Sequence, residues 1–476
     1  MPSEYRKVYI TNKHQKTISE LIEYENVGAQ IDISQYLTFK SGYYLGTISC
    51  MNSLIYDGLK GENISPIIYQ KSPKKLQKGD IVISRNASLG KISFINDNSK
   101  IILNGGLSVL KIKDLFKYYV SAFFVVDYGT EYLTCLTSGG GTQQNAKRQN
   151  LLDVPIPFPT INNNQKPQDI ETLVSLIVQN IIDKEQQIKN KNTLIDDLIE
   201  EELQTNQQQN SFSYSYPTIN EIKEETRLDT GLYEKEFKKM DFLIRNYENG
   251  FFKLLSKYEA SRGQNLQVSN IGESIYSETQ KDNFYRLFTN VELSDDRTIS
   301  NYRWLGNKNK LKLIPPKTIF LSADGTVGRC IYLSNMSKTI TNIHPWNINR
   351  IRKTESEFED VFVAMFLGFL YKKNFYEKIK DKANGGGIKL NHLERYIKIP
   401  NFPKYKQQEI AKEYYNPLGK NNNILTLQNY LEKEKERNKN IGIFQLNMEI
   451  FELKERLSDL IHKIITEEKI EIVLDY

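Results

Sequence analysis

Two polar segments of the chain, around Ser84 and around Ser322, carry side chains of the types that hydrogen-bond to the edges of nucleic-acid bases. The first contains Arg85, Asn86, Ser88 and Lys91, and the second contains Asp324, Thr326 and Arg329. Arginine suits the O6 and N7 atoms of guanine, asparagine suits adenine, and a carboxylate accepts from the amino group of cytosine. The alternative is that these are solvent-facing residues of turns in which Gly90 and Gly328 adopt positive φ.

The two segments are parts of one long repeat. Ser84 and Ser322 are 238 residues apart (322 − 84), and the same offset relates Asn104 to Asn342. An apolar stretch precedes each segment, at 79–83 and 317–321, and predicts a buried strand that enters a tight turn. Glycine triplets follow at 139–141 and 385–387. Because this period far exceeds the roughly 20 to 50 residues of a solenoid unit, the repeat indicates a duplicated domain.

Further candidate contacts occur at matched positions of the two repeats. Lysines before a turn suit phosphate contacts, which position DNA without reading its sequence, although solvated lysines at a strand edge are the alternative for each one. The candidates are Lys74, Lys75 and Lys78 in the first copy and Lys308, Lys310 and Lys312 in the second. Asn104 and Asn342 begin loops of different content, since Gly105-Gly106 in the first copy corresponds to a loop with His344 and Trp346 in the second. Trp346 is expected either to pack in the core or to stack on a base. Asn145 and Asn391 are expected to cap turns, with contact to a nucleic acid as the alternative.

Motifs of common catalytic sites are missing from the sequence. It contains neither the Asn-Pro-Pro-Tyr nor the Asp-Pro-Pro-Tyr tetrad of amino-methyltransferases, and neither a GxxxxGK[ST] loop nor an HExxH pair. His344 has no Cys or second His at ligand spacing, and Cys50, Cys135 and Cys330 are far apart. We therefore expect a non-catalytic chain with no metal site and no disulfide framework.

Charge alternates along the 476 residues, although the formal net charge is only +6. The counts are +5 for residues 1–162, −7 for 163–230, +9 for 231–403 and −1 for 404–476. Two basic modules joined by spacers that are not basic would suit a polyanionic partner, while excesses of this size also occur in many soluble proteins. The N-terminus lacks the apolar core of a signal peptide, and the most apolar run, 361–371, is about half a membrane span. A cytoplasmic location is expected.

Two segments have the spacing of long helices. After Pro167, apolar residues recur in steps of four and three as far as Glu202, with Lys184 and Lys191 in the same seam. The pattern returns from Leu446 to Ile464. The two helices are predicted to pack on each other antiparallel, with an intermolecular coiled coil as the alternative. The residues of these two seams that are expected at a subunit interface are Ile177, Ile181, Ile188, Ile195, Leu198, Leu453, Leu457, Leu460 and Ile464.

With these features, the chain resembles the specificity subunit of type I restriction-modification systems. The likeness rests on residues 79–85 with Gly90, on 142–145 leading to 155–157, on 319–322 with Gly325 and Gly328, and on 407–411 and 451–457. Arg227-Leu228-Asp229 also matches, but residues 1–30 contain no clear counterpart of it. The resemblance implies an α+β fold with two target-recognition domains, separated by two long antiparallel helical regions with approximate twofold symmetry.

The implied domains are a first target-recognition domain at 1–162, a central helical spacer at 163–215, a second target-recognition domain at 216–403 and a C-terminal helical spacer at 404–476. Each recognition domain would read one half of a bipartite DNA target, and the helices would set the gap and dock two adenine-N6 methyltransferase subunits. Restriction subunits are a further implied partner. S-adenosylmethionine, ATP and Mg²⁺ would be bound by these partners and not by this chain.

The leading hypothesis is a non-catalytic DNA-specificity subunit of a type I complex. A related alternative is the equivalent subunit of a methylation-only or other phage-defence system. From a different class, the alternative is an intracellular protein-interaction scaffold with duplicated modules and no role in nucleic-acid binding.

Overall fold

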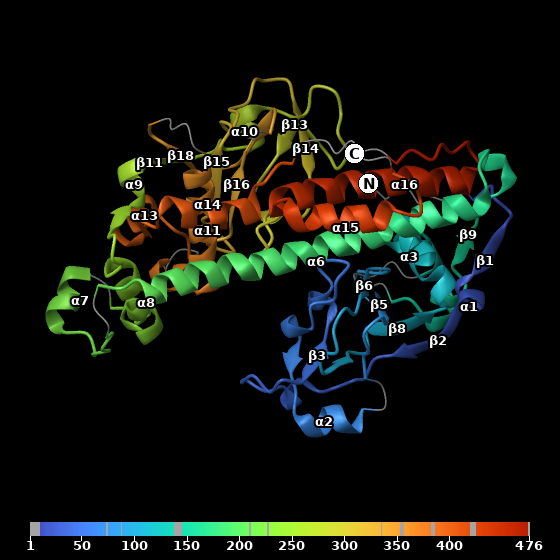
Figure 1. Ribbon diagram of the computed structural model, residues 1–476, viewed down its shortest axis with the longest axis horizontal. Coiled ribbons are helices and arrows are strands. Elements are labelled where there is room, and N and C mark those ends of the chain that lie inside the picture. The colour runs from blue at the N-terminus through green and yellow to red at the C-terminus, as the bar shows by residue number, and fades with distance from the viewer. Residues whose placement is uncertain are drawn as a thin grey trace. The chain divides into compact units, whose positions relative to one another are not determined.

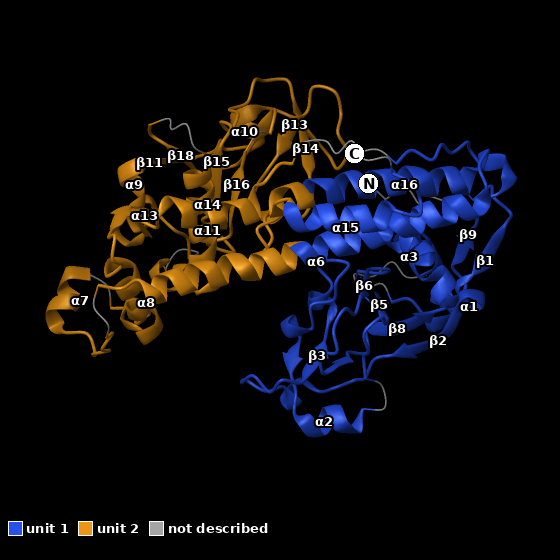
Figure 2. Ribbon diagram, viewed as in Figure 1, with its two compact units in different colours: residues 1–187, 419–440, 448–476 blue, residues 188–418, 441–447 orange. Residues whose placement is uncertain are grey.

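The computed structural model divides the chain into two compact units (Figure 2). Unit 1 contains residues 1–187, 419–440 and 448–476, and unit 2 contains residues 188–418 and 441–447. The structure describes residues 10–72, 75–86, 88–137, 145–208, 211–225, 228–334, 336–352, 357–381, 386–418 and 425–474. Both units combine helices with small sheets, so the predicted α+β class is confirmed (Figure 1).

Unit 1 contains three sheets, with strand orders β2-β8-β5-β6, β4-β3-β7 and β1-β9. Its strands are β1 (Gln15–Thr17), β2 (Ile22–Val27), β3 (Tyr44–Gly46), β4 (Glu62–Asn63), β5 (Ile81–Ser84), β6 (Ile92–Phe94), β7 (Ile101–Leu103), β8 (Leu107–Ile112) and β9 (Pro155–Pro157). Its shorter helices are α1 (Ile18–Leu21), α2 (Pro66–Lys71), α3 (Lys117–Val125), α4 (Tyr128–Leu136) and α5 (Arg148–Leu152). All four residues of β5 are buried, as its continuous apolar run predicts for a strand with both faces covered.

Unit 2 repeats the same arrangement, with strand orders β11-β18-β15-β16, β12-β14-β13-β17 and β10-β19. Its strands are β10 (Phe251–Lys253), β11 (Tyr258–Arg262), β12 (Ser274–Ser277), β13 (Tyr285–Leu287), β14 (Arg303–Asn307), β15 (Thr318–Ser322), β16 (Cys330–Leu333), β17 (Thr339–Ile340), β18 (Pro345–Arg350) and β19 (Lys398–Pro400). Its shorter helices are α7 (Ile219–Glu225), α8 (Lys235–Arg245), α9 (Leu254–Lys257), α10 (Val268–Ile271), α11 (Phe358–Lys372), α12 (Phe375–Ile379) and α13 (Leu390–Tyr396). The most apolar run of the sequence lies in α11, whose residues from 360 to 370 are all buried.

The duplication extends to the pairing of individual residues. Ile81 on β5 pairs with Leu110 on β8, and Ile319 on β15 pairs with Ile348 on β18, so both members of the pair shift by 238 residues. The parallel pair β3 and β7 likewise corresponds to the parallel pair β13 and β17. Among the described residues, β12 of unit 2 has no counterpart in the β4-β3-β7 sheet of unit 1. A one-residue slip would turn every side chain to the other face of the sheet, so the constant offset indicates that both units keep the same faces buried.

The longest helix is α6 (Pro167–Thr205), with 39 residues. It contributes residues 167–187 to unit 1 and 188–205 to unit 2. The predicted seam is buried from Ile170 to Ile195, but Leu198 is half-buried while the neighbouring Ile199 is fully buried. The buried stripe has therefore moved by one residue, because a straight helix with 3.6 residues per turn drifts from a heptad seam.

Shorter helices pack on α6 within each unit. They are α14 (Lys404–Tyr414) in unit 2, α15 (Tyr430–Asn440) in unit 1, and α16 (Ile443–Thr466), which is in unit 1 from residue 448 onward. Lys184 on α6 contacts Glu449 near the start of α16, whereas Asn163, just before α6, donates to the carbonyl of Lys463 near its end, so these helices are antiparallel as predicted. Helix α15 runs parallel to α6 instead, since Asn180 contacts Glu434 and Lys184 contacts Asn438.

Most of the predicted interface residues are buried within the units. Ile177, Ile181, Ile188, Ile195, Leu457, Leu460 and Ile464 are at most 6% exposed, and Leu198 and Leu453 are half-buried. The seven buried side chains therefore contribute to helix packing inside this chain. The search for membrane spans finds no helix in the described part of the chain that is long and apolar enough to cross a bilayer.

A buried charge cluster fixes the packing of the helices in unit 1. The Lys184 side chain is 1% exposed, and its Nζ lies 2.6 Å from Glu449 Oε2 and 3.1 Å from Glu434 Oε2. Arg437 contacts both oxygens of Glu449, at 2.6 and 2.5 Å. Burial raises the pKa of Glu449, but Arg437 and Lys184 outweigh this effect and hold it below its usual value. Such a cluster is satisfied in one register of the helices only, because a shifted register would leave charges buried without partners.

We predict that Lys184→Ala lowers the free energy of unfolding by about 3 to 5 kcal/mol, because it removes the cation that compensates the buried Glu434 carboxylate. The matched control is Lys433→Ala on α15, where an exposed lysine lies 3.7 Å from Glu436. Removal of such a surface pair should cost less than about 1 kcal/mol. Urea unfolding followed by circular dichroism measures both, and similar losses for the two variants would contradict the assignment of Lys184 as a structural anchor.

Candidate nucleic-acid interface

The β5–β6 turn of unit 1 is built around Ser84 and Gly90. Ser84 N donates to Lys91 O at 2.9 Å, Gly90 N donates to Ser84 O at 3.0 Å, and the Ser84 hydroxyl donates to Ser88 O. Gly90 has a φ of 74°, a conformation that glycine adopts without strain. These bonds close the turn while the side chains of Asn86, Ser88 and Lys91 remain exposed.

The β15–β16 turn of unit 2 is closed by the same bonds. Ser322 N donates to Arg329 O and Gly328 N donates to Ser322 O, both at 2.8 Å, and the Ser322 hydroxyl donates to Thr326 O at 2.6 Å. Gly328 has a φ of 99°. The two serines and two glycines are therefore structural, and the difference between the turns lies in the side chains between them.

In unit 1 the turn meets two other segments at the same end of the main sheet. Arg85 N donates to Gly106 O at 2.9 Å, and Ala146 N donates to Arg85 O at 2.8 Å. The Arg85 guanidinium reaches Gly105 O at 3.4 Å, and Asn104 Oδ1 accepts from Gly106 N at 2.9 Å. We call Arg85, Asn86, Asn104 and the segments that hold them the unit 1 loop cluster. The structure thus brings together these predicted residues from distant positions in the sequence.

Unit 2 forms the corresponding loop cluster, which contains Asp324, Asn342 and His344. Ile388 N donates to Ala323 O at 2.8 Å, as Ala146 N does to Arg85 O in unit 1. Asn342 Oδ1 accepts from His344 N at 3.1 Å, and His344 Nδ1 lies 3.2 Å from Asp324 Oδ2. The two clusters therefore share this backbone connection and the bonds that close their turns, and they differ in their exposed groups.

Trp346 lies in the interior beside the unit 2 loop cluster. It is 7% exposed, and its indole N–H donates to Ile388 O at 2.8 Å. The guanidinium of Arg262 covers one face of the ring, 3.8 Å from the centroid. Burial lowers the pKa of Arg262, and the charge of Asp324 offsets part of this shift. This environment favours the packing role of Trp346 over base stacking.

The predicted lysines are not all at these clusters. The predicted contact Lys78 precedes β5, and Lys317 is the lysine directly before β15 in unit 2. Each lies at the opposite end of a four- or five-residue strand from the turn, about 13 to 17 Å away. Lys317 is paired with Glu357 at 3.3 Å. Lys75 is exposed with its Nζ 5.2 Å from the centroid of the Tyr69 ring, and Lys74 lies outside the described residues. Proximity in sequence to the turn therefore did not indicate proximity in space.

The remaining predicted contacts of unit 2 differ in accessibility. Lys312 lies beside the loop cluster, with its Nζ 3.5 Å from Arg262 O. Lys308 and Lys310 are exposed in the segment after β14, and Thr326 is exposed in the turn. Arg329 is held inside the unit by Asp295 Oδ1 and Leu293 O, each at 2.8 Å. Burial alone would lower the pKa of Arg329, but Asp295 and Tyr371 outweigh burial and raise it.

Arg262 is the main residue that the sequence did not indicate. It ends β11 and pairs with Trp346 on β18, 84 positions further along the chain (346 − 262). No short motif marks this position, because its place in the cluster arises from cross-strand pairing. The first glycine triplet, residues 142–144 and Gly385 lie outside the described residues.

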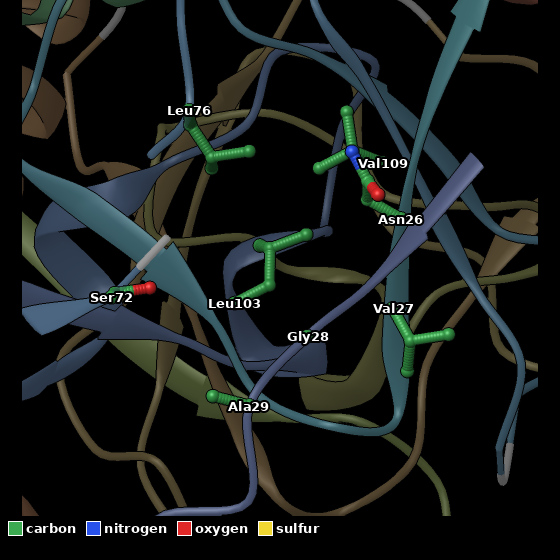
Figure 3. Close-up of a pocket in the computed structure, with 8 residues that line it drawn as sticks. All are labelled: Asn26, Val27, Gly28, Ala29, Ser72, Leu76, Leu103 and Val109. Atoms are coloured by element: carbon green, nitrogen blue, oxygen red, sulfur yellow. The ribbon is translucent and has the colours of Figure 1, made fainter. Parts of the chain in front are cut away.

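A cavity of about 200 Å³ lies in unit 1 next to this end of the sheet (Figure 3). Its lining is mostly apolar, with Asn26 and Ser72 as the polar side chains. Gly28 lines it on one side and packs against the loop cluster, because a Cβ there would lie 2.1 Å from Asn104 O. Among the described residues, no group of three His, Cys, Asp or Glu side chains is placed to hold a metal ion.

A comparison with protein families finds one match, in the first part of the chain. Residues 10–191 match the type I restriction modification DNA specificity domain. The match contains β1 to β9, the unit 1 loop cluster and the first part of α6. For residues 10–191, the resemblance that the sequence motifs indicated is thereby confirmed.

Three solved structures are similar to nearly the whole chain. The S subunit of a type I restriction-modification system from M. genitalium is 13% identical, with 98% of this chain and 99% of that chain covered and a TM-score of 0.41. A structure described for complex assembly and conformational transition of the type I R-M system is 13% identical, with 96% and 99% covered and a TM-score of 0.29. The HsdS subunit from Thermoanaerobacter tengcongensis is 14% identical, with 95% and 96% covered and a TM-score of 0.27. A comparison with curated proteins finds no match.

We predict that Gly328→Ala destabilises the protein more than Gly325→Ala. Both glycines have positive φ, which costs an alanine about 1 to 2 kcal/mol. A Cβ at Gly328 would also lie 2.3 Å from the buried Tyr376 ring, whereas a Cβ at Gly325 would meet nothing within 4 Å. Overpacking should add about 1 to 3 kcal/mol at Gly328. Chemical unfolding of the two variants measures the difference, and equal losses would show that the turn does not pack as described.

Proposed function

We propose that this chain is a non-catalytic DNA sequence-specificity subunit of a type I restriction-modification complex, in which each loop cluster recognises one half of a bipartite target. The observation that carries the proposal is the pair of loop clusters with equivalent turns, one shared backbone connection to each turn, and different exposed side chains. The family match supports the proposal for residues 10–191. The constant offset in strand pairing extends it to the sheet of unit 2, because the same scaffold holds loops at the same strand ends.

The side chains that remain exposed suit different parts of this task. Asn86 and Ser88 in unit 1, with Asp324 and His344 in unit 2, have the donors and acceptors that contact base edges. Lys91 and Lys312 lie at or beside the clusters and suit phosphate contacts. Arg329 is a weaker candidate than its sequence position indicated, because its guanidinium is already held by Asp295 and Leu293.

The long helices are proposed to set the gap between the half-sites and to dock two adenine-N6 methyltransferase subunits. Their polar and exposed faces would provide the docking surface, since the predicted seam residues are buried in this chain. S-adenosylmethionine, ATP and Mg²⁺ would be bound by methyltransferase and restriction subunits. A methylation-only complex would use the same chain without the restriction partner.

Binding to duplex DNA tests the proposal against the scaffold alternative. We expect the complex that co-purifies with the chain to select one bipartite sequence from a random duplex library, about a thousandfold over unrelated duplexes. Its affinity should fall steeply as salt rises, because phosphate contacts release counterions. Binding that lacks sequence preference at every salt concentration would support the scaffold alternative and refute the proposal.

The gap gives a separate prediction. Each base pair inserted between the half-sites moves them about 3.4 Å apart and rotates one relative to the other by roughly 35°. If the helices fix the spacing, duplexes with one or two added base pairs should bind little better than a duplex with a single half-site. Competition binding measures this series. Unchanged affinity across the series would refute the spacing role and leave half-site recognition intact.

A further inference from the structure

Asp324 is the centre of a polar group at the exposed end of the unit 2 sheet. His344 Nδ1 lies 3.2 Å from Asp324 Oδ2, and Arg262 Nη1 lies 3.6 Å from the same oxygen. The side chains are 54% exposed for His344, 41% for Asp324 and 27% for Arg262. The arginine is therefore the inner member of the group, and the imidazole is the outermost.

The surrounding contacts hold this group in place. Arg262 also donates to the carbonyls of His344 and Ile388, and it stacks on the buried Trp346 ring. Asn290 Nδ2 donates to Asp324 O at 2.8 Å. A Cβ at Gly387 would lie 2.3 Å from Asp324 Oδ1, so the carboxylate packs directly against backbone there. A recognition group that is fixed before binding loses little conformational entropy when it binds.

The aspartate also determines which nitrogen of the imidazole carries hydrogen. An ionised carboxylate accepts a hydrogen bond, so Nδ1 of His344 must be the donor to Asp324. In the neutral ring, Nε2 is then an acceptor. Nε2 has no hydrogen-bond partner among the described residues. An outward-facing acceptor at a base edge matches the exocyclic amino groups of adenine and cytosine in the major groove.

The described residues of unit 1 form no equivalent group. The strand pairing places Val27 opposite Ser108 where unit 2 has Arg262 opposite Trp346. At the 238-residue offset, the counterparts of Asp324 and His344 are Asn86 and Gly106. The shared scaffold therefore carries an Arg-Asp-His group in unit 2, where unit 1 has the exposed amide of Asn86 at the position of Asp324, and this gives the two units different recognition chemistry.

We propose that His344 is a base-reading residue of unit 2, whose Nε2 accepts from the exocyclic amino group of an adenine or cytosine in its half-site. Asp324 and Arg262 are positioning residues that fix the ring and its tautomer. This inference rests on the proposed function and adds the contact that distinguishes one half-site from the other.

The test is selection of half-site sequences by the purified complex from a duplex library in which both halves are randomised. His344→Ala removes the whole ring. His344→Asn keeps a donor near the position of Nδ1, which can still contact Asp324, but it lacks the Nε2 end. Both variants should lose about 5- to 150-fold of the preference at one position of one half-site, and leave the other half-site unchanged. Asn86→Ala is the matched variant in unit 1 and should relax only the other half-site.

The outcomes separate the inference from the function on which it rests. If His344→Asn keeps the full preference while His344→Ala loses it, His344 acts only by positioning Asp324, and the inference is overturned. It is also overturned if both variants keep the wild-type preference, or if both half-sites relax together. If the wild-type complex shows no bipartite preference at all, the proposed function itself fails.

Discussion

The burial of Lys184 within an apolar helix seam is the constraint on which the helical part of this protein depends. Its charge is acceptable there only because Glu434, Glu449 and Asn438 converge on it from two other helices. Glu185 follows Lys184 on α6 and points in another direction. Its carboxylate accepts a hydrogen bond from Leu54 N at 2.7 Å, and burial raises the pKa of Glu185. The same turn of helix therefore fixes the helical packing of unit 1 and holds its globular part.

Unit 2 satisfies the same constraint with different residues. Lys191, one heptad after Lys184, contacts Glu413 on α14 at 2.6 Å. The buried Arg297 donates to Asn192 Oδ1 at 2.8 Å and thereby ties the loop before β14 to α6. Each unit is thus an assembly of a duplicated sheet with its own section of α6, joined by buried polar contacts that allow little sliding. Rigid attachment of the loop clusters is what recognition of fixed base positions requires.

Sequence reasoning predicted the features that rest on local or repeated patterns. The 238-residue offset corresponds to a shared strand register, and the Ser–Gly pairs form equivalent turns. The heptad spacing corresponds to a buried seam on α6. It could not predict features that depend on pairing across the fold. No sequence pattern marks the direction in which α15 runs along α6. Arg262 reaches Asp324 only through the pairing of β11 with β18. Lys78 was predicted to lie near the turn, but strand β5 lies between Lys78 and the turn and separates them.

The central claim is that one chain presents two related recognition surfaces to a divided DNA sequence while partner subunits modify it. Methylated adenines mapped across the genome, in cells with the chain and in cells from which it is deleted, test this most directly. The account predicts that one set of methylated sites disappears on deletion, and that these sites share two short conserved elements separated by a constant number of variable bases. An unchanged methylation pattern, or lost sites that share a single uninterrupted element, would contradict it.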